Sequence, residues 1–133
     1  MASTNYDIFI SYSHNDLKWV KESLLKKLED ESFNVFIDFR DFTTGSFSVE
    51  EMQRAVLQSR KVLIVLTNNY LKSEWGKFEN VMAQTLDPAA VNRKIIPVLR
   101  EDCDIPLRLR ILHYCDLRND IDSKWEMLLR DLY

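Results

Sequence analysis

The chain is poor in the residues that build glycine-rich loops and disulfide frameworks. Its 133 residues include only two glycines, three prolines and two cysteines. Phosphate-binding loops of the Rossmann and P-loop kinds need several glycines within a few residues, and Gly45 and Gly76 each stand alone. Cys103 and Cys115 are too few for a disulfide framework or a four-ligand zinc site. We therefore expect no metal site.

The chain also lacks a long apolar run and an excess of positive charge. No stretch approaches the ~20 apolar residues that span a bilayer, so we expect a cytoplasmic protein that does not insert into membranes. With 18 Lys and Arg against 21 Asp and Glu, the formal net charge is −3, which predicts no general affinity for nucleic acid. The length predicts a single domain over residues 1–133, with an ordered core from about residue 5 to 133.

Short apolar runs alternate with helical patterns along the chain. Strands are predicted at residues 6–12, 34–37, 62–66, 95–99 and 113–117, and the third of these is apolar throughout, as in a strand covered on both faces. Helices are predicted over 17–28, from 48, over about 73–86 and from about 122, with one turn after Pro106. This alternation predicts an α/β fold: a flavodoxin-like, five-stranded parallel sheet of order 2-1-3-4-5, flanked by helices on both faces.

One carboxylate falls at an unexpected place in the helical pattern. At about 100° per residue, Glu79 lies in the same arc as the apolar residues Trp75, Phe78 and Met82. Its side chain either packs at the margin of the arc with its carboxylate in water, or occupies a partly dry cleft beside an aromatic wall. In the second case it would act on a cationic substrate.

Two predicted loops carry further candidate residues at the carboxyl edge of the sheet, where such folds bind ligands. The loop of residues 38–48 contains Phe39, Phe42 and Phe47 together with charges and Gly45, which suits a positive φ. It either packs on the sheet, closes over a ligand or docks a protein. Residues 11–15, Ser-Tyr-Ser-His-Asn, either contact a ribose or diphosphate or cap the following helix.

Taken in order, four segments of the chain resemble the Toll/interleukin-receptor (TIR) domains. Tyr6–Ser13 is similar to the first box of that family, and residues 36–45 resemble its second strand and BB loop. Residues 55–66 are similar to its second helix and third strand, and Ser73–Glu79 resembles its Ser-x-Trp-x-x-x-Glu segment. The resemblance covers nearly the whole chain, from Tyr6 to Tyr133.

Departures from the animal receptors point to a particular branch of this family. Thr44 stands where those receptors usually have a proline, and their Phe-Trp third box is missing. Residues 94–99 and 103–106 resemble the bacterial and axon-degeneration-type members instead. That branch includes enzymes that cleave NAD+.

The resemblance implies that the chain is an NAD+ nucleosidase with Glu79 as its catalytic carboxylate. Nicotinamide in NAD+ is already a cationic leaving group, so a single carboxylate suffices, unlike ordinary glycoside hydrolysis. Water would give ADP-ribose, and a nucleophile within the substrate would give a cyclic ADP-ribose. NAD+ is then the substrate, and no cofactor is needed. The implied substrate-binding residues are Ser11, Tyr12, Ser13, His14, Asp38, Arg40, Gly45, Phe47 and Trp75. Both glycines fall at this implied site.

The same resemblance allows a second function, a non-enzymatic adaptor that associates with other TIR domains. Its docking surface would be the loop of residues 38–48, in homotypic and filament-like assemblies. In either case we expect a role in immune or cell-death signalling. The chain is short for a whole signalling protein, so we expect it to be a domain excised from a larger one.

Overall fold

The described residues form a parallel five-stranded sheet with the predicted strand order. The computed structural model describes residues 5–42, 44–45, 48–84 and 88–133. The strands are β1 (Tyr6–Ser11), β2 (Val35–Phe36), β3 (Ser59–Leu66), β4 (Ile95–Leu99) and β5 (Cys115–Asp116). They lie in the order β2-β1-β3-β4-β5, and each pair is parallel. The expected fold class is confirmed.

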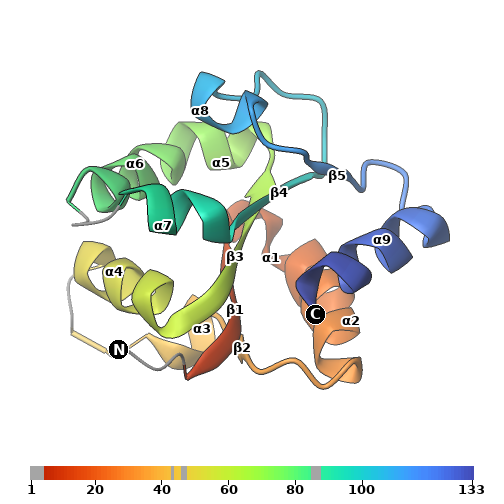
Figure 1. Ribbon diagram of the computed structural model, residues 1–133, viewed down its shortest axis with the longest axis horizontal. Coiled ribbons are helices and arrows are strands. Elements are labelled where there is room, and N and C mark those ends of the chain that lie inside the picture. Colours follow the sequence, from red (N-terminus) through yellow and green to blue (C-terminus); the bar gives the residue numbers. More distant parts are fainter. Residues whose placement is uncertain (1–4, 43, 46–47, 85–87) are drawn as a thin grey trace.

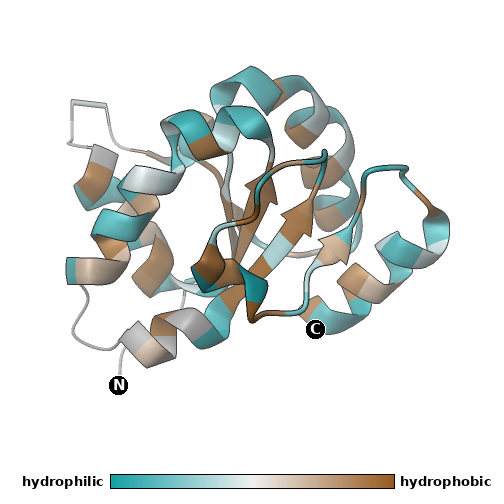
Figure 2. Cartoon of the chain, turned by 90° about the horizontal axis from the view of Figure 1, so that it is seen from above, coloured by the Kyte–Doolittle hydropathy of each residue, from teal (hydrophilic) through white to brown (hydrophobic). Residues whose placement is uncertain are grey.

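Helices cover both faces of this sheet, as Figure 1 shows. The first face carries α1 (Leu17–Trp19), α2 (Lys26–Asp30) and α9 (Asp122–Leu132). The second face carries α4 (Ser48–Gln58), α5 (Asn68–Ser73), α6 (Trp75–Gln84), α7 (Pro88–Lys94) and α8 (Leu107–Arg110). Figure 2 shows the hydrophobic strands enclosed between these layers. Two apolar clusters, one on each face, form the core.

The sequence periodicity predicted most of the helices that cover the sheet, but the observed helices differ from the predicted ones in their limits. The predicted helix over 17–28 is real, but between α1 and α2 it contains a π-helical segment, Val20–Leu25. The helix expected over about 73–86 is present as α6, and residues 85–87 lie outside the described residues. Helix α5, which ends at Ser73 just before it, was not predicted. Helix α7 was not predicted because its apolar pattern is short, although Pro88 at its first position is typical of a helix N-terminus.

The stretch after β2, expected to be a loop throughout, begins with a helical turn. Residues Asp38–Asp41 form a helical turn, α3, whose backbone is closed by bonds from Arg40 and Asp41 N–H to the Ile37 carbonyl. The Asp41 carboxylate in turn accepts a bond from the Ile37 N–H at 2.9 Å. The short helix fixes the direction of Asp38 at the end of the sheet.

Candidate functional site

A cleft of about 150 Å³ opens at the carboxyl end of β1, on the second face of the sheet. Its walls come from the three segments that follow β1, β2 and β3, together with α4. The lining residues are Phe9, Ile10, Ser11, Tyr12, His14, Asp38, Phe42, Met52, Glu74 and Lys77. We call this the carboxylate cleft. Its position agrees with the sheet edge at which doubly wound folds bind ligands.

Asp38 joins two of these segments. Its Oδ1 accepts a hydrogen bond from the Tyr12 hydroxyl at 2.7 Å, and its Oδ2 lies 2.6 Å from His14 Nε2. Burial of the phenol, and then its bond to Asp38, raise the pKa of Tyr12 well above its usual value. Tyr12 is therefore a neutral donor that holds the carboxylate in place, while the imidazole of His14 is exposed at the rim.

Glu74 places a second carboxylate in the cleft. It lies where α5 ends and α6 begins, its side chain is only 18% exposed, and its Oε1 lies 3.6 Å from Lys77 Nζ. Burial raises the pKa of Tyr70, which shares a 2.8 Å hydrogen bond with Ser11, and the charge of Glu74 raises it further. Two carboxylates thus face one small cleft whose remaining wall is largely apolar and aromatic.

Of the two alternatives for Glu79, the structure bears out the one at the margin of the apolar arc with its carboxylate in water, and not the one in a partly dry cleft. Glu79 is exposed, whereas Trp75 and Phe78 are buried and their rings stack at 6.0 Å between centroids. The buried side of α6 consists of Trp75, Phe78, Val81 and Met82, and Glu79 lies just outside it. Glu74 lies on that side because it precedes Phe78 by one helical turn, a spacing that the sequence contains and that we missed. The catalytic role of Glu79 stays a prediction.

The other candidate residues from the predicted loops are buried, or bonded to other parts of the chain, or outside the described residues. Ser11 and Ser13 are buried, and Ser13 Oγ accepts a bond from the Asn15 N–H at 3.3 Å, so its expected capping role is confirmed. Arg40 bonds Glu29 and the Val35 carbonyl and does not line the carboxylate cleft. Phe47 lies outside the described residues.

The two glycines differ in whether the structure requires a glycine at their positions. Gly45 has a φ of +87°, the positive value expected for it. A Cβ added at Gly76 would meet no atom within 4 Å, so the missing side chain there does not make room for anything in the described part of the chain.

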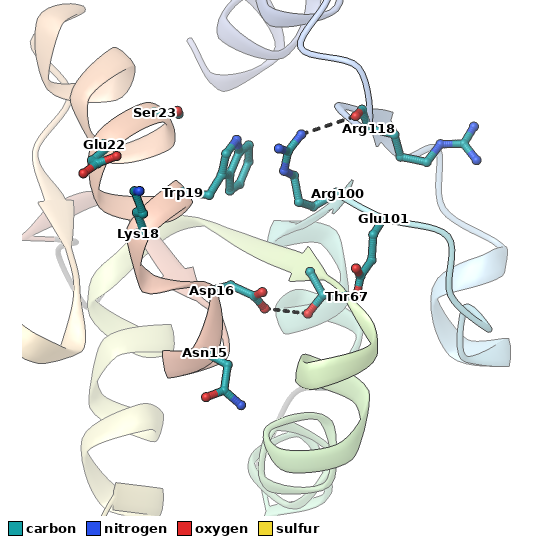
Figure 3. Close-up of a pocket in the computed structure, with 10 residues that line it drawn as sticks. All are labelled: Asn15, Asp16, Lys18, Trp19, Glu22, Ser23, Thr67, Arg100, Glu101 and Arg118. Atoms are coloured by element: carbon teal, nitrogen blue, oxygen red, sulfur yellow. Dashed lines mark hydrogen bonds between the residues drawn. The ribbon is translucent and has the colours of Figure 1, made fainter.

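A larger hollow, of about 540 Å³, opens at the same sheet edge on the other face (Figure 3). We call it the arginine crevice. Thr67 Oγ1 donates to Asp16 at 2.6 Å, which ties the end of β3 to the segment after β1. The Arg100 guanidinium lies 4.6 Å above the Trp19 ring and donates to the Leu117 carbonyl at 2.8 Å.

The charged groups of this crevice are largely occupied by the chain itself. Figure 3 shows the Arg118 guanidinium turned away from Trp19 and Arg100, and it pairs with Asp116 and Asp102. Glu101 accepts a bond from the Asn68 N–H at 2.7 Å. The crevice is larger, but its polar groups serve mainly to join strand ends to one another.

The described residues lack two features that bear on function. No helix among them is both long and apolar enough to cross a membrane. In the same part of the chain, no group of three or more His, Cys, Asp and Glu side chains is arranged to hold a metal ion.

Comparisons with known proteins agree on one family. A family model described as TIR domain matches residues 8–132. Toll-like receptor 2 of Canis lupus familiaris is 40% identical over 76 residues, which are 56% of this chain and 10% of the receptor. This chain thus spans only a small part of the curated relatives that it matches.

Solved structures agree with this result. The TIR domain of the Toll-related receptor TRR-2 from Hydra magnipapillata is 28% identical, with a TM-score of 0.81 over 96% of this chain and 98% of that one. A metazoan TIR-STING receptor from C. gigas is 26% identical, with a TM-score of 0.72 over 95% of this chain and 40% of that one. These relatives are receptors by name.

Proposed function

The chain belongs to the TIR domain family, and on that premise we propose that it cleaves the nicotinamide–ribosyl bond of NAD+. The products would be nicotinamide and ADP-ribose, or a cyclic ADP-ribose. We place this activity in the cytoplasm, in immune or cell-death signalling, and the substrate, the enzyme class and the location all belong to the proposal.

The observation that carries the proposal is the pair of carboxylates, Asp38 and Glu74, in the carboxylate cleft. A cavity of about 150 Å³ is known to accommodate a benzene-sized ring, and this cleft has that volume. Phe9, Phe42 and Met52 supply an apolar wall. A flat ring with a positive charge, such as the pyridinium of NAD+, matches both the wall and the carboxylates.

The cleft holds one ring and not a whole dinucleotide, so the rest of NAD+ must extend past its rim. His14 and Lys77 are exposed cationic or polar groups at that rim, and we assign the diphosphate to them. Ser11 lines the cleft and lies beside the ring, whereas Ser13 and Trp75 are buried and do not line it, so they have no direct contact with substrate in this proposal. Arg40 is engaged with Glu29.

The proposed chemistry needs stabilisation of positive charge at the anomeric carbon. As the ribosyl bond breaks, its electron pair leaves with nicotinamide and neutralises the pyridinium, while the sugar becomes oxocarbenium-like. A carboxylate beside that carbon stabilises the developing charge, and water or an internal nucleophile then forms the new bond and loses its proton. Family resemblance assigns this carboxylate to Glu79, and the geometry of the carboxylate cleft adds Glu74 as a second candidate.

Nicotinamide release from NAD+ tests the proposal. We expect the wild-type domain to release it at high protein concentration, and Glu126→Gln, at an exposed site on α9, to match the wild type. Loss of release in Glu79→Gln alone would support the assignment from resemblance, and loss in Glu74→Gln alone would move the catalytic role to Glu74. No release by the wild type, or equal release by all four proteins, would refute the activity.

A neighbouring copy is expected to complete the site, because the cleft by itself encloses only a ring. Nicotinamide release should then rise faster than in proportion to protein concentration. Strict proportionality over a wide range would show that a single copy is self-sufficient.

The second candidate function is association with other TIR domains without catalysis. It is favoured by the names of the relatives, which are receptors, and by the exposed ring of Phe39 on α3. We propose the segment of residues 38–48 as its docking surface. Loss of self-association in Phe39→Ser, with NAD+ left intact by the wild type, would support this function over the first.

A further inference from the structure

Glu74 and Lys77 form an ion pair at the rim of the carboxylate cleft. Both residues line the cleft, and Lys77 Nζ lies 3.6 Å from Glu74 Oε1. This distance is longer than a hydrogen bond, so the two groups attract one another without a directional bond between them. An ion pair of this kind contributes little free energy and separates easily.

The two members of the pair are held to different degrees. The Glu74 N–H donates to the Tyr70 carbonyl at 2.8 Å, and the Glu74 carbonyl accepts a bond from the Phe78 N–H at 3.1 Å, which fixes Glu74 between α5 and α6. The side chain of Glu74 is 18% exposed, whereas that of Lys77 is 47% exposed. Because the lysine ammonium sits on a flexible carbon stem, Lys77 can leave the pair while Glu74 stays in place.

The other carboxylate of the cleft has partners of a different kind. Asp38 accepts a hydrogen bond from the Tyr12 hydroxyl at 2.7 Å, and its second oxygen lies 2.6 Å from His14 Nε2. Among the described residues that line the cleft, Lys77 is the one lysine or arginine. In the free chain its ammonium therefore occupies the position beside Glu74 that the cationic ring of a ligand would take.

We propose that Lys77 exchanges partners when a ligand binds. A cationic pyridine ring takes the place of the ammonium beside Glu74, and the Lys77 side chain turns outward to the diphosphate of the same ligand. This inference rests on the proposed function, because it names the class of ligand that the same cleft selects. One ion pair of the free chain is replaced by two in the complex.

The exchange makes the cleft selective for ligands that carry both charges. A pyridinium alone must separate Lys77 from Glu74 and leaves the ammonium without a partner. A diphosphate alone draws Lys77 outward and leaves Glu74 without a cation. An oxidised nicotinamide dinucleotide supplies both charges, whereas the reduced dinucleotide has a neutral ring and should bind more weakly. Lys77 is thus a specificity-determining residue.

The two charged parts of such a ligand should assist one another even when they are not joined. A diphosphate that draws Lys77 outward leaves Glu74 available to a cation, and by linkage the cation strengthens the binding of the diphosphate by the same factor. This coupling requires an ammonium that moves between the two positions. A lysine that only stabilised the start of α6 would not produce it.

Titration calorimetry with two separate probes tests the exchange. The probes are 1-methylnicotinamide, a pyridinium without phosphate, and ADP, a diphosphate without the pyridine. Saturating ADP should tighten the binding of 1-methylnicotinamide to the wild type about threefold, as expected for one exposed ion pair. In Lys77→Met, 1-methylnicotinamide alone should bind about threefold more tightly than to the wild type, ADP should bind more weakly, and the coupling should vanish.

Two further variants serve as controls. Lys77→Arg keeps the positive charge on a long side chain and should retain the coupling. Lys72→Met removes another exposed lysine, on α5, that does not line the cleft. It should bind both probes as the wild type does.

The exchange is overturned if the wild type shows no coupling, or if the coupling survives in Lys77→Met. It is also overturned if Lys77→Met binds 1-methylnicotinamide no more tightly than the wild type, or if neither protein binds it. None of these measurements requires cleavage. Nicotinamide release together with any of these results would refute the exchange and leave the activity standing, and the expected binding without release would do the reverse.

Discussion

The carboxylate cleft and the arginine crevice lie at the same edge of the sheet, on opposite faces, and differ in what their charged groups do. In the crevice, Asp16 bonds Thr67 and Arg100 bonds Leu117, so the polar groups connect strand ends. In the cleft, Asp38 also joins two segments through Tyr12 and His14, but both Asp38 and Glu74 line a hollow with an apolar wall. The larger hollow is therefore a structural junction, and the smaller one is the better candidate for a ligand.

The largest effect that separates the two regions is expected at Arg100. Arg100→Ala removes a charge-assisted bond to the Leu117 carbonyl and the contact with the Trp19 ring, and should lower the free energy of unfolding by about 3 kcal/mol. Urea denaturation measures it. Arg93→Ala, at an exposed site on α7, is the control and should change stability by less than about 0.5 kcal/mol. Similar losses in both variants would show that the crevice is not a structural junction.

Within the cleft, Tyr12→Phe should lower the free energy of unfolding by less than Arg100→Ala does. The variant loses the hydroxyl that donates to Asp38 at 2.7 Å, which is worth about 1.5 kcal/mol at neutral pH. The pKa of Tyr12 is raised in the folded chain, first by burial and then by Asp38, so its stabilising effect is complete below pH 10.0 and declines above it.

Urea denaturation from pH 7 to 11 measures this dependence. The stability difference between wild type and Tyr12→Phe should narrow above pH 10.0, the ordinary pKa of tyrosine. A difference that stays constant or widens would show that the phenol is not held neutral by the cleft.

The next contrast is between the two glycines, because only Gly45 has a backbone conformation that disfavours a side chain. Gly45→Ala forces a Cβ onto a residue with φ of +87° and should destabilise the chain by about 1 kcal/mol. Gly76→Ala adds a Cβ in open space within α6 and should stabilise it by about 0.5 kcal/mol. Thermal unfolding of both variants checks the signs, and equal signs would contradict the backbone assignment.

The smallest effect is expected beside the crevice, at Asp116. Hydrogen bonds from Arg118 lower the pKa of this carboxyl from 3.8 to about 2. The ionised form therefore stabilises the fold above pH 3.8, and this contribution is lost as the pH falls toward 2. Wild type should exceed Asp116→Asn slightly in stability at pH 5, and the difference should vanish near pH 2. The effect is small because the pair is solvent-exposed.

The sheet was predictable from sequence because its strands are short apolar runs with little ambiguity. Residues 95–99 were predicted with their observed limits, and the all-apolar run at 62–66 lies in the central strand β3. The limits of the edge strands were predicted less accurately. Strand β5 pairs only through Cys115 and Asp116, and its apolar signal in the sequence is weak.

The site was only partly predictable, for a reason visible in α6. Glu74 lies on the buried side of α6, one turn before Phe78, whereas Glu79 lies just outside that side. The sequence contains this spacing, but the observed limits of α6, with Glu74 directly before its first residue, come from the structure. The bonds that join Tyr12, His14 and Asp38 depend on the turn α3, whose four residues carry no apolar period.

The binding of small pyridine ligands tests the central claim about the carboxylate cleft most directly. Titration calorimetry would compare 1-methylnicotinamide, a cation methylated on the ring nitrogen, with nicotinamide, its neutral counterpart of nearly the same shape. We predict that the cation binds more tightly to the wild type, and that Glu74→Gln removes most of this preference while Glu126→Gln keeps it. Equal binding of the two ligands, or a preference that survives Glu74→Gln unchanged, would contradict the account.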